Sequence, residues 1–324
     1  MSLTGFLAIP LMFAMAMPTV SVETLAVSCA DLRPTVEAIA VILESRYVLP
    51  ARGAEGATRL RAAARRGDVS HICGDGPAKA AALTRATRGV LNDLHLRVAF
   101  GAPESSEPPA KPDVDALVDN LGIEDVSRLP GGIGYIRLST WAPIAWAEPR
   151  LANAFALLRD STGLIIDVRG NPGGDGDTVN LVERTFLPIG APSTLRAFDR
   201  AGKPAKWEES KEPEWPRFPL DMPLIVLINR ESASGSEALA FSLREERRAT
   251  IIGTRSAGAA HVLRDAVSLP GGFALYIPQY RYEGRLSHTD WEGVGVQPDI
   301  EAGPKDAKML AWEFLRKNQD GAKK

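Results

Sequence analysis

The chain has 324 residues, of which 45% are hydrophobic and 24% charged, and its formal net charge is −2 at pH 7. This balance is typical of a globular protein with room for one large or two modest domains, and it excludes an electrostatic nucleic-acid binder. With only two cysteines, the chain has no cysteine-based zinc motif.

Residues 1–22 are apolar and uncharged and contain the small-residue stretch "AMA". They predict a secretory signal or a retained membrane anchor, although no basic residue comes before Arg33. We therefore expect export to the periplasm or cell envelope, with membrane association if the segment is retained. In that compartment Cys29 and Cys73 can pair; otherwise they are two unrelated buried thiols.

Residues 23–100 contain several Ala-, Leu- and Arg-rich stretches with apolar residues at helical spacing. This pattern predicts an all-helical N-terminal domain. Residues 101–130 open with a stretch dense in Pro, Ser and Glu, which predicts a linker.

Residues 131–324 change in texture, because β-rich runs now alternate with helical patterns. The runs "GIGYIRLS", "GLIIDVRG", "PLIVLIN" and "ATIIG" are predicted strands. Strands alternating with helices indicate an α/β core with a largely parallel sheet. The segment around Pro270-Gly271-Gly272 predicts a β-hairpin, and "DAKMLAWEFLRKNQ" predicts a final amphipathic helix.

The turn "GNPGG", residues 170–174, follows a predicted strand and precedes a predicted helix. Glycines let the backbone approach a ligand closely, and amides at a helix start point outward as donors. The turn is therefore suited to an anion or an oxyanion, or it is only a tight connection between strand and helix. It lacks the Lys-Ser/Thr ending of a P-loop.

The stretch "RESASGSEALAF" places Ser232, Ser234 and Ser236 where a predicted strand turns into a helix. One interpretation is a capping box, with Ser234 as the cap and Glu237 three residues later. The other is that one serine is a nucleophile, which requires a base from elsewhere in the chain.

Three motifs, "GLIIDVRGNPGG", the serine stretch continuing to "GTRSAGAAH", and "WEGVGVQPDIEA", follow one another over residues 131–302. In this order they resemble the tail-specific, or C-terminal-processing, serine peptidase family. The segment "TRATRGVLNDLHLRVAFG" is similar to the helical domain of interphotoreceptor retinoid-binding protein and its bacterial relatives. The resemblance implies a crotonase-like (ClpP/crotonase) core.

In this family the nucleophile falls on Ser234. Many members use a Ser-Lys dyad, whose lysine position here is Ala259, so the resemblance excludes that mechanism for this chain. An acidic or polar position on the helix after the serine corresponds to Glu245.

A second branch, which includes the tricorn core, implies a Ser-His-Glu arrangement. Its histidine comes from a D-x-H motif, here Asp93 and His95, and its acid precedes "GVGVQPD", here Glu292. His95 would accept the serine proton, and Glu292 would orient the imidazole directly or through a relay. His261 is the rival base, and each of these residues has a purely structural alternative. The implied oxyanion hole consists of the amides of Gly235, Gly173 and Gly174.

The sequence thus predicts a serine-type peptidase, a hydrolase acting on peptides or unfolded proteins. The alternative is a non-catalytic binding module for a hydrophobic ligand or peptide in the same cleft. Either way we expect no metal, no cofactor and no nucleic-acid partner; the oligomeric state is open. The linker is too short for a PDZ-like domain, which argues against specificity for C-terminal tails.

Overall fold

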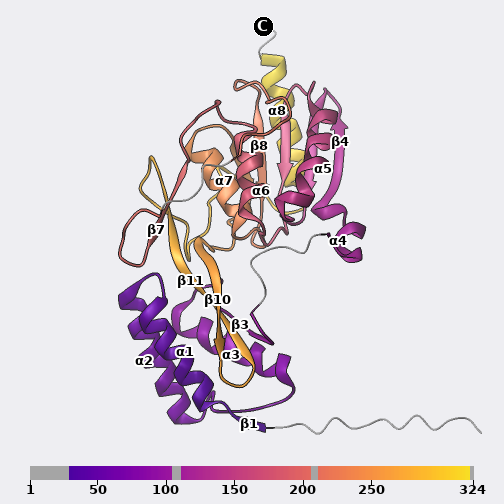
Figure 1. Ribbon diagram of the computed structural model, residues 1–324. Helices are drawn as coiled ribbons and strands as arrows, with labels where there is room; N and C mark the ends of the chain where they lie inside the picture. Colours follow the sequence, from indigo (N-terminus) through magenta and orange to yellow (C-terminus); the bar gives the residue numbers. More distant parts are fainter. Residues whose placement is uncertain (1–28, 104–110, 206–210, 322–324) are drawn as a thin grey trace, which may run out of the picture.

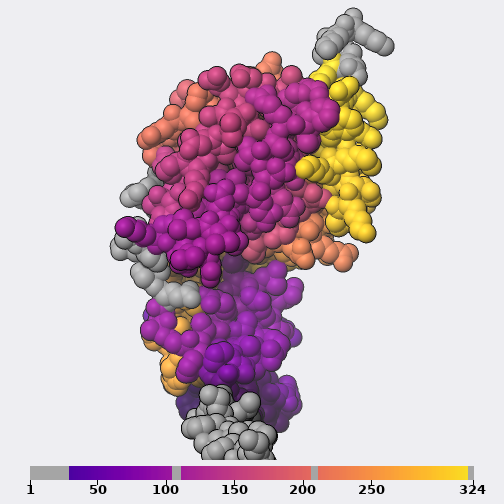
Figure 2. All heavy atoms as spheres, turned by 90° about the vertical axis from the view of Figure 1, so that its right-hand side faces the viewer, coloured from indigo at the N-terminus to yellow at the C-terminus, as the bar shows by residue number. Residues whose placement is uncertain are grey.

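The computed structural model describes residues 29–103, 111–205 and 211–321. The predicted signal or anchor, residues 1–22, lies outside this range. No helix within the described residues has the length and apolar composition needed to span a membrane. Figure 1 shows a group of N-terminal helices at one end and a helix-covered sheet at the other. In the turned view of Figure 2, the broader sheet body sits on the narrower N-terminal body.

Three helices form most of the N-terminal body: α1 (Arg33–Arg46), α2 (Pro50–Arg66) and α3 (Gly76–Leu91). All three have a proline in the first turn, where its missing N–H costs nothing. The carboxylate of Asp75 caps α3 by accepting the N–H of Ala78 at 2.8 Å. The apolar faces of the helices turn inward to a common core.

The expectation of an all-helical N-terminal domain is wrong, because this body also contains strands. β1 (Cys29–Asp31) pairs antiparallel with β2 (His71–Cys73). β3 (Arg97–Phe100) pairs antiparallel with β11 (Phe273–Gly284), which comes from the far end of the chain. Strands of three or four residues are too short to show a period of two in the sequence. The helices need this cover, since an apolar helix face must pack on another element.

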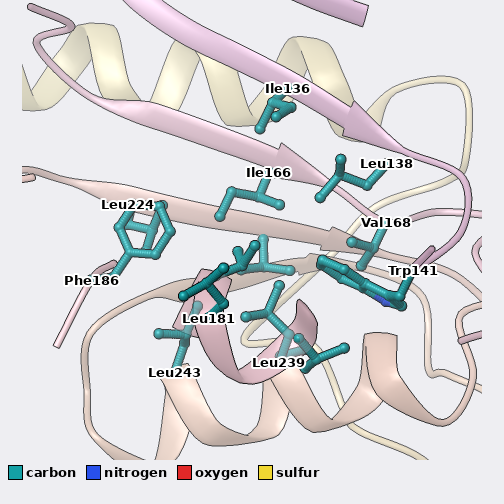
Figure 3. Close-up of a cluster of buried hydrophobic side chains, with 14 of the residues drawn as sticks. Ile136, Leu138, Trp141, Ile166, Val168, Leu181, Phe186, Leu224, Leu239 and Leu243 are labelled. Atoms are coloured by element: carbon teal, nitrogen blue, oxygen red, sulfur yellow. The ribbon is translucent and has the colours of Figure 1, made fainter. Parts of the chain in front are cut away.

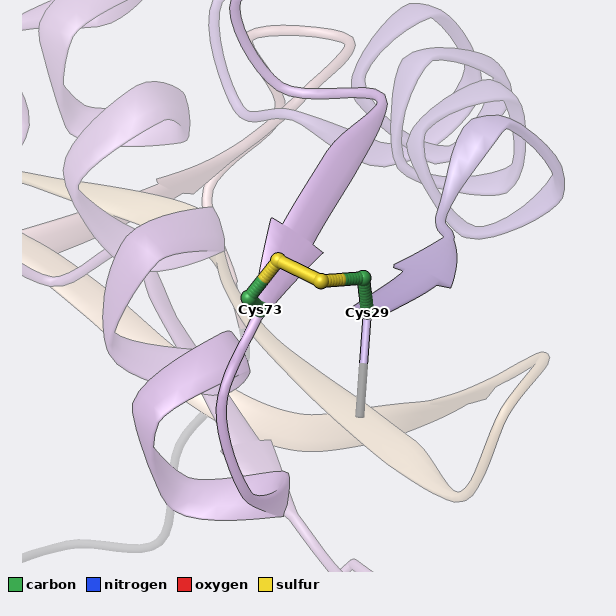
Figure 4. The surroundings of a disulfide bond; sticks show 2 residues. All are labelled: Cys29 and Cys73. Carbon is green, nitrogen blue, oxygen red and sulfur yellow. A yellow bond between two sulfur atoms is a disulfide. The ribbon is translucent and has the colours of Figure 1, made fainter. Parts of the chain in front are cut away.

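Cys29 and Cys73 form a disulfide. They face each other in the register of β1 and β2, as Figure 4 shows. Of the two alternatives for these thiols, pairing is the one that the structure has. The bond closes a loop that contains α1 and α2.

The predicted hairpin is confirmed. β10 (His261–Leu269) pairs antiparallel with β11 across the Pro270-Gly271-Gly272 turn. Gly271 and Gly272 have φ of 82° and 77°, which a glycine adopts without strain. The hairpin extends from the sheet body to the N-terminal helices, and β7 (Leu195–Asp199) pairs with its other end. This hairpin is therefore the main connection between the two bodies.

The second body contains a six-stranded sheet in the order β12-β9-β8-β6-β5-β4. The first five of these strands are parallel, and β4 runs antiparallel to β5. This confirms the predicted mixed α/β character and the four predicted strands. Their bounds are β4 Ile123–Leu129, β5 Ile133–Leu138, β6 Leu164–Asp167, β8 Leu224–Ile228, β9 Thr250–Gly253 and β12 Ile300–Glu301.

Part of the predicted linker, residues 101–130, belongs to this sheet. It includes β4, the short helix α4 (Val114–Val118) and a 3₁₀ turn, Asn120–Gly122. β4 carries several charged residues, as edge strands commonly do, so its composition resembles that of a loop. The sheet body therefore begins earlier than residue 131.

Successive side chains of the central strands point to opposite faces, and each face has its own helices. Ile166 of β6 shares a core with α5 (Ile144–Leu158), α6 (Gly176–Arg184) and α7 (Gly235–Glu245). Figure 3 shows it beside Leu181 of α6 and Leu239 of α7. The neighbouring Ile165 faces α8 (Ala307–Gly321) instead. Because both faces are covered, the central strands read as continuous apolar runs.

Candidate active site

The serine-rich turn connects β8 to α7 at the carboxyl edge of the sheet. Ser234 has φ 51° and ψ −116°, a strained conformation for a residue other than glycine. Ser232 Oγ donates to the carbonyl of Val168 at 2.8 Å, so this serine fixes the turn to the neighbouring strand connection. Such a sharp strand-to-helix turn exposes the side chain at its apex.

The three serines therefore have different surroundings. Ser236 is fully buried, and its Oγ accepts the indole N–H of Trp141 at 2.9 Å. Ser232 and Ser236 account for the structural role that the sequence suggested for this cluster. Ser234 alone places its hydroxyl beside an imidazole, that of His95.

Glu237 is the buried anchor of the turn. Its carboxylate accepts the N–H of Ser234 at 2.9 Å, which is one half of the predicted capping box. It also accepts the hydroxyl of Ser256 and the N–H groups of Gly258 and Ala259. Burial raises the pKa of Glu237, and the four donors oppose this rise. Capping and a reactive hydroxyl are compatible here: Ser234 and Glu237 form the predicted capping box, and the Ser234 hydroxyl still lies beside Nε2 of His95.

The position of the family's dyad lysine is occupied by a buried alanine. The N–H of Ala259 bonds to Glu237, and its carbonyl accepts the indole N–H of Trp291 at 3.1 Å. The carboxylate of Glu245, further along α7, accepts the N–H groups of Leu286 and Ser287 at 2.7 Å each. Glu245 thus anchors a loop.

The glycine turn after β6 packs directly against the turn that carries Ser234. A Cβ on Gly173, whose φ is 109°, would lie 2.8 Å from Cβ of Ser234 and 3.1 Å from N of Gly235. The N–H of Gly173 donates to Oδ1 of Asn171 at 2.9 Å, so this predicted oxyanion donor is already engaged. Gly235 is the first residue of α7, where N–H groups lack partners inside the helix. Of the three predicted donors, Gly173 is therefore the one whose N–H already has an acceptor within the described residues.

Sequence reasoning missed Asn171, which joins the two turns. Its buried side-chain amide donates to the carbonyl of Leu138 at 3.1 Å, and its backbone carbonyl accepts the N–H of Ala233 at 3.0 Å. Asp167 and Arg169 form an ion pair at the end of β6, with Nε of Arg169 2.8 Å from Oδ1 of Asp167. The sequence signal that could have identified Asn171 is that it follows closely after the buried strand β6.

His95 comes from the N-terminal body, in the loop between α3 and β3. Its Nε2 lies 3.0 Å from Oγ of Ser234, although the two residues are 139 positions apart. Nδ1 is buried and has no hydrogen-bond partner among the described residues. Burial lowers the pKa of His95, because it disfavours the charged imidazolium. The imidazole is therefore neutral near pH 7 and can accept a proton.

Asp93 holds the loop that carries His95. Oδ1 accepts the N–H of His95 at 2.9 Å, and Oδ2 accepts the hydroxyl of Tyr47 at 2.8 Å. Nδ1 of His261 lies 2.7 Å from the same Oδ2. Burial alone would raise the pKa of Asp93, but the hydrogen bonds from His261 and Tyr47 outweigh it and lower the pKa.

Glu292 lies near His95 but makes no direct hydrogen bond to it. One carboxylate oxygen accepts the N–H groups of Ala260 and His261, at 2.7 and 3.0 Å. The other is buried and has no hydrogen-bond partner in the described part of the chain. Burial, and then the charge of Asp93, raise the pKa of Glu292 to about 7.

Asp93, His95 and Glu292 each have one atom of a kind that can bind a metal ion, and these three atoms lie within 4.8 Å of one another. Both oxygens of Asp93 already accept hydrogen bonds from protein groups. His261, the predicted rival base, contacts this group rather than the nucleophile: its Nδ1 faces Asp93, and its side chain is almost fully buried. The structure thus brings all the predicted side chains of the site into one cluster, with His95 next to Ser234.

Comparison with known proteins adds the family. The model of peptidase family S41 matches residues 132–302. The chain is 31% identical over 177 residues to a carboxyl-terminal-processing protease of Synechocystis, covering 54% of this chain and 39% of the relative. It is 32% identical over 205 residues to a carboxy-terminal-processing protease of Bartonella bacilliformis, covering 58% of this chain and 43% of the relative. The chain thus matches about two fifths of the length of these relatives.

Among solved structures, a candidate peptidase from Parabacteroides merdae superposes with a TM-score of 0.61 at 20% identity. The match covers 88% of this chain and 97% of that one, so the shared fold includes the N-terminal body. The family match itself includes Ser234 and Glu292 and leaves out Asp93 and His95. Since that match spans more than half of the sequence, the chain belongs to peptidase family S41.

Proposed function

We propose that the protein is a serine-type peptidase in which Ser234 is the nucleophile and His95 the general base. The observation that carries this proposal is the 3.0 Å approach of His95 Nε2 to Ser234 Oγ. The strained backbone of Ser234 and the depressed pKa of His95 fit the same roles. A base within hydrogen-bond reach is the geometric requirement for activating a serine hydroxyl.

In the proposed reaction Ser234 Oγ attacks the peptide carbonyl carbon while His95 takes the hydroxyl proton. The carbonyl oxygen becomes an oxyanion, for which the N–H groups of Gly235 and Gly174 are the donors we propose. Each such donor contributes about 3–4 kcal/mol to barrier reduction. His95 then protonates the leaving amine as the C–N bond breaks, which leaves an acyl ester on Ser234. Water attacks this ester while His95 takes its proton; the C–Oγ bond breaks, His95 returns the proton to Ser234 Oγ, and a carboxylic acid is released.

Glu292 is proposed to stabilise the His95 imidazolium without touching it. Both Nδ1 of His95 and the second oxygen of Glu292 are buried and lack partners among the described residues. A water molecule between two such groups would satisfy both, and a water-mediated bond is nearly as favourable as a direct one. Glu292 is therefore a relay member of a Ser-His-Glu arrangement.

The proposed substrates are peptides or unfolded proteins, in keeping with the processing proteases among the relatives. We infer that the protein works after export, in the periplasm or cell envelope. The Cys29–Cys73 disulfide supports this, because such bonds persist in oxidising compartments. Residues 1–22 would supply the export signal or a membrane anchor.

The motif order is what supports a crotonase-like core and a place in the retinoid-binding-protein-like branch. The alternative function from that branch is a non-catalytic module for a hydrophobic ligand or peptide. Such a module has no use for an imidazole placed at a strained serine, and for this reason we favour the peptidase.

The test is covalent labelling with a fluorophosphonate, followed by mass spectrometry, together with cleavage of an unfolded protein. The wild-type chain should be labelled on Ser234, and Ser234→Ala should lose both labelling and cleavage. Ser236→Ala is the matched control from the same turn and should still be labelled. Labelling that persists in Ser234→Ala, or a wild-type chain that binds peptide without cleaving it, would overturn the proposal.

A further inference from the structure

We propose that His261 is a positioning residue of this site: a charged imidazole that faces both Asp93 and Glu292, holds the His95 loop against Ser234 and favours the ionised form of Glu292. The inference rests on the proposed peptidase function and adds a residue to it. His261 would not exchange a proton with substrate; it would act through the two carboxylates.

The first argument is the path of contacts between the two bodies. His261 opens β10 in the C-terminal half, and its Nδ1 lies 2.7 Å from Oδ2 of Asp93, 168 positions earlier. The other oxygen of Asp93 accepts the N–H of His95 at 2.9 Å. Two hydrogen bonds thus connect β10 to the backbone of the proposed base. Because His95 and Ser234 belong to different bodies, a link of this kind decides whether they meet.

The second argument is charge. Asp93 and Glu292 both face the same ring nitrogen of His261: Nδ1 lies 2.7 Å from Oδ2 of Asp93 and 3.7 Å from the second oxygen of Glu292. One oxygen of Asp93 and one of Glu292 lie within 4.8 Å of each other. Two buried carboxylates this close repel each other unless a nearby cation offsets their charge. The N–H of His261 also donates to Glu292 at 3.0 Å, so backbone and ring bind the two acids together.

The other groups around His261 carry charges of both signs. Asp290 adds negative charge, and Tyr47 presents its ring edge at 5.9 Å between centroids. His95 is the nearby group that disfavours a second positive charge, and Arg281 faces His261 across the hairpin. Burial lowers the pKa of His261, but the bond to Asp93 and the charges of Glu292 and Asp93 prevail and raise it.

As a consequence, the pKa of Glu292 depends on the charge of His261. The pKa of Glu292 is already raised to about 7, and the charge of His261 opposes that rise. Without the imidazolium, Glu292 takes up a proton at higher pH than before. A protonated Glu292 cannot stabilise the charged form of His95 during the reaction.

Two variants separate the hydrogen bond from the charge. His261→Asn keeps an amide N–H that can reach Asp93 but carries no charge, and His261→Leu removes both. His71→Asn is the control, because His71 is an exposed histidine on β2 outside the site. Circular dichroism checks that each variant is folded, and the readout is the second-order rate of fluorophosphonate labelling from pH 5 to 9.

We expect His261→Leu to label about ten- to a hundredfold more slowly at pH 7, which is the loss typical when a residue that orients a site residue is removed. In His261→Asn the rise of the labelling rate with pH should occur at higher pH, because Glu292 keeps its proton longer. Above that range the rate should recover toward that of the wild type. His71→Asn should match the wild type. A wild-type profile in both His261 variants, or a uniform loss of rate with no shift of this rise, would overturn the positioning role.

A second measurement does not depend on activity. In Ser234→Ala labelled with ¹⁵N-histidine, the ring nitrogens of His261 should show imidazolium shifts at pH 7, and a neutral ring would refute the inference. These results differ from failure of the proposed function, which appears as a wild-type chain that the fluorophosphonate never labels.

Discussion

The Ser234 turn and the His95 loop are held from different parts of the chain. Ser234 is positioned within one sheet body, where the backbone of Gly173 packs against it and buried Glu237 binds its N–H. His95 belongs to the other body and is held by Asp93, which in turn bonds to His261. A buried carboxylate binds the backbone of each residue, but the partners of Glu237 all lie in the sheet body, whereas Asp93 is bonded to His261 from the other half of the chain. The comparison teaches that the nucleophile is a local product of the sheet, and that the base depends on how two bodies are joined.

The largest effect should come from removing the base. His95→Ala leaves Ser234 in its turn but deprives it of a proton acceptor, so kcat/KM on a peptide should fall by about 10⁴-fold or more. His261→Ala should retain part of the activity. If His95→Ala stays active while His261→Ala is dead, the base role passes to His261, and the comparison between the two regions fails.

The next effect tests the steric side of the comparison. Gly173→Ala would place a Cβ 2.8 Å from Cβ of Ser234 at a φ of 109°, so the two turns must move apart. Displacing the oxyanion donors should lower the labelling rate by about 10²–10³-fold at every pH. Gly176→Ala, where no atom lies within 4 Å of the added Cβ, is the control and should label normally.

A smaller effect, of about 10²-fold at its maximum, should follow Glu292→Gln, and it should depend on pH. Glu292 is ionised only above its pKa of about 7, whereas the lowered pKa of His95 keeps that ring neutral there. Wild-type activity should therefore rise with pH through about 7, and Glu292→Gln should lack this limb. An unchanged limb in the variant would assign it to another group.

The same shift has a consequence for stability. The pKa of Glu292 is raised from 4.5 to about 7, so between these values the folded state binds more protons than the unfolded state. Glu292 should therefore make the free energy of unfolding decrease as pH rises through this window. Urea unfolding of the wild type and of Glu292→Gln at pH 5 and 7.5 measures the difference.

The smallest effect on labelling should come from the disulfide. Replacing Cys29 and Cys73 by serine opens a loop with a sequence separation of 44 and should cost about 2–4 kcal/mol of stability. The loop ends before Asp93, so the labelling rate of the folded variant should stay near that of the wild type. A folded variant that is no longer labelled would show that the disulfide also holds the base.

Some of the structure could be predicted from residues close together in the chain. The strands around Ile166 and the turn at Ser234 carry strong local signals, because buried parallel strands are continuous apolar runs. The strands β1 and β3 carried none, since they are short and gain their partners from distant segments. The charged edge strand β4 was mistaken for a linker for the same reason.

By itself the sequence supplied the candidate residues, because a serine at a predicted strand-to-helix turn is a pattern of residue type and order, and the resemblance to a known family singled out the D-x-H motif and the acid before a glycine turn. Only the tertiary structure decided their relations: that Ser234 rather than its neighbours meets an imidazole, that this imidazole is His95, and that one nitrogen of His261 faces two acids. Distances and burial set hydrogen bonds and pKa values, and both arise only when segments far apart in the chain pack together.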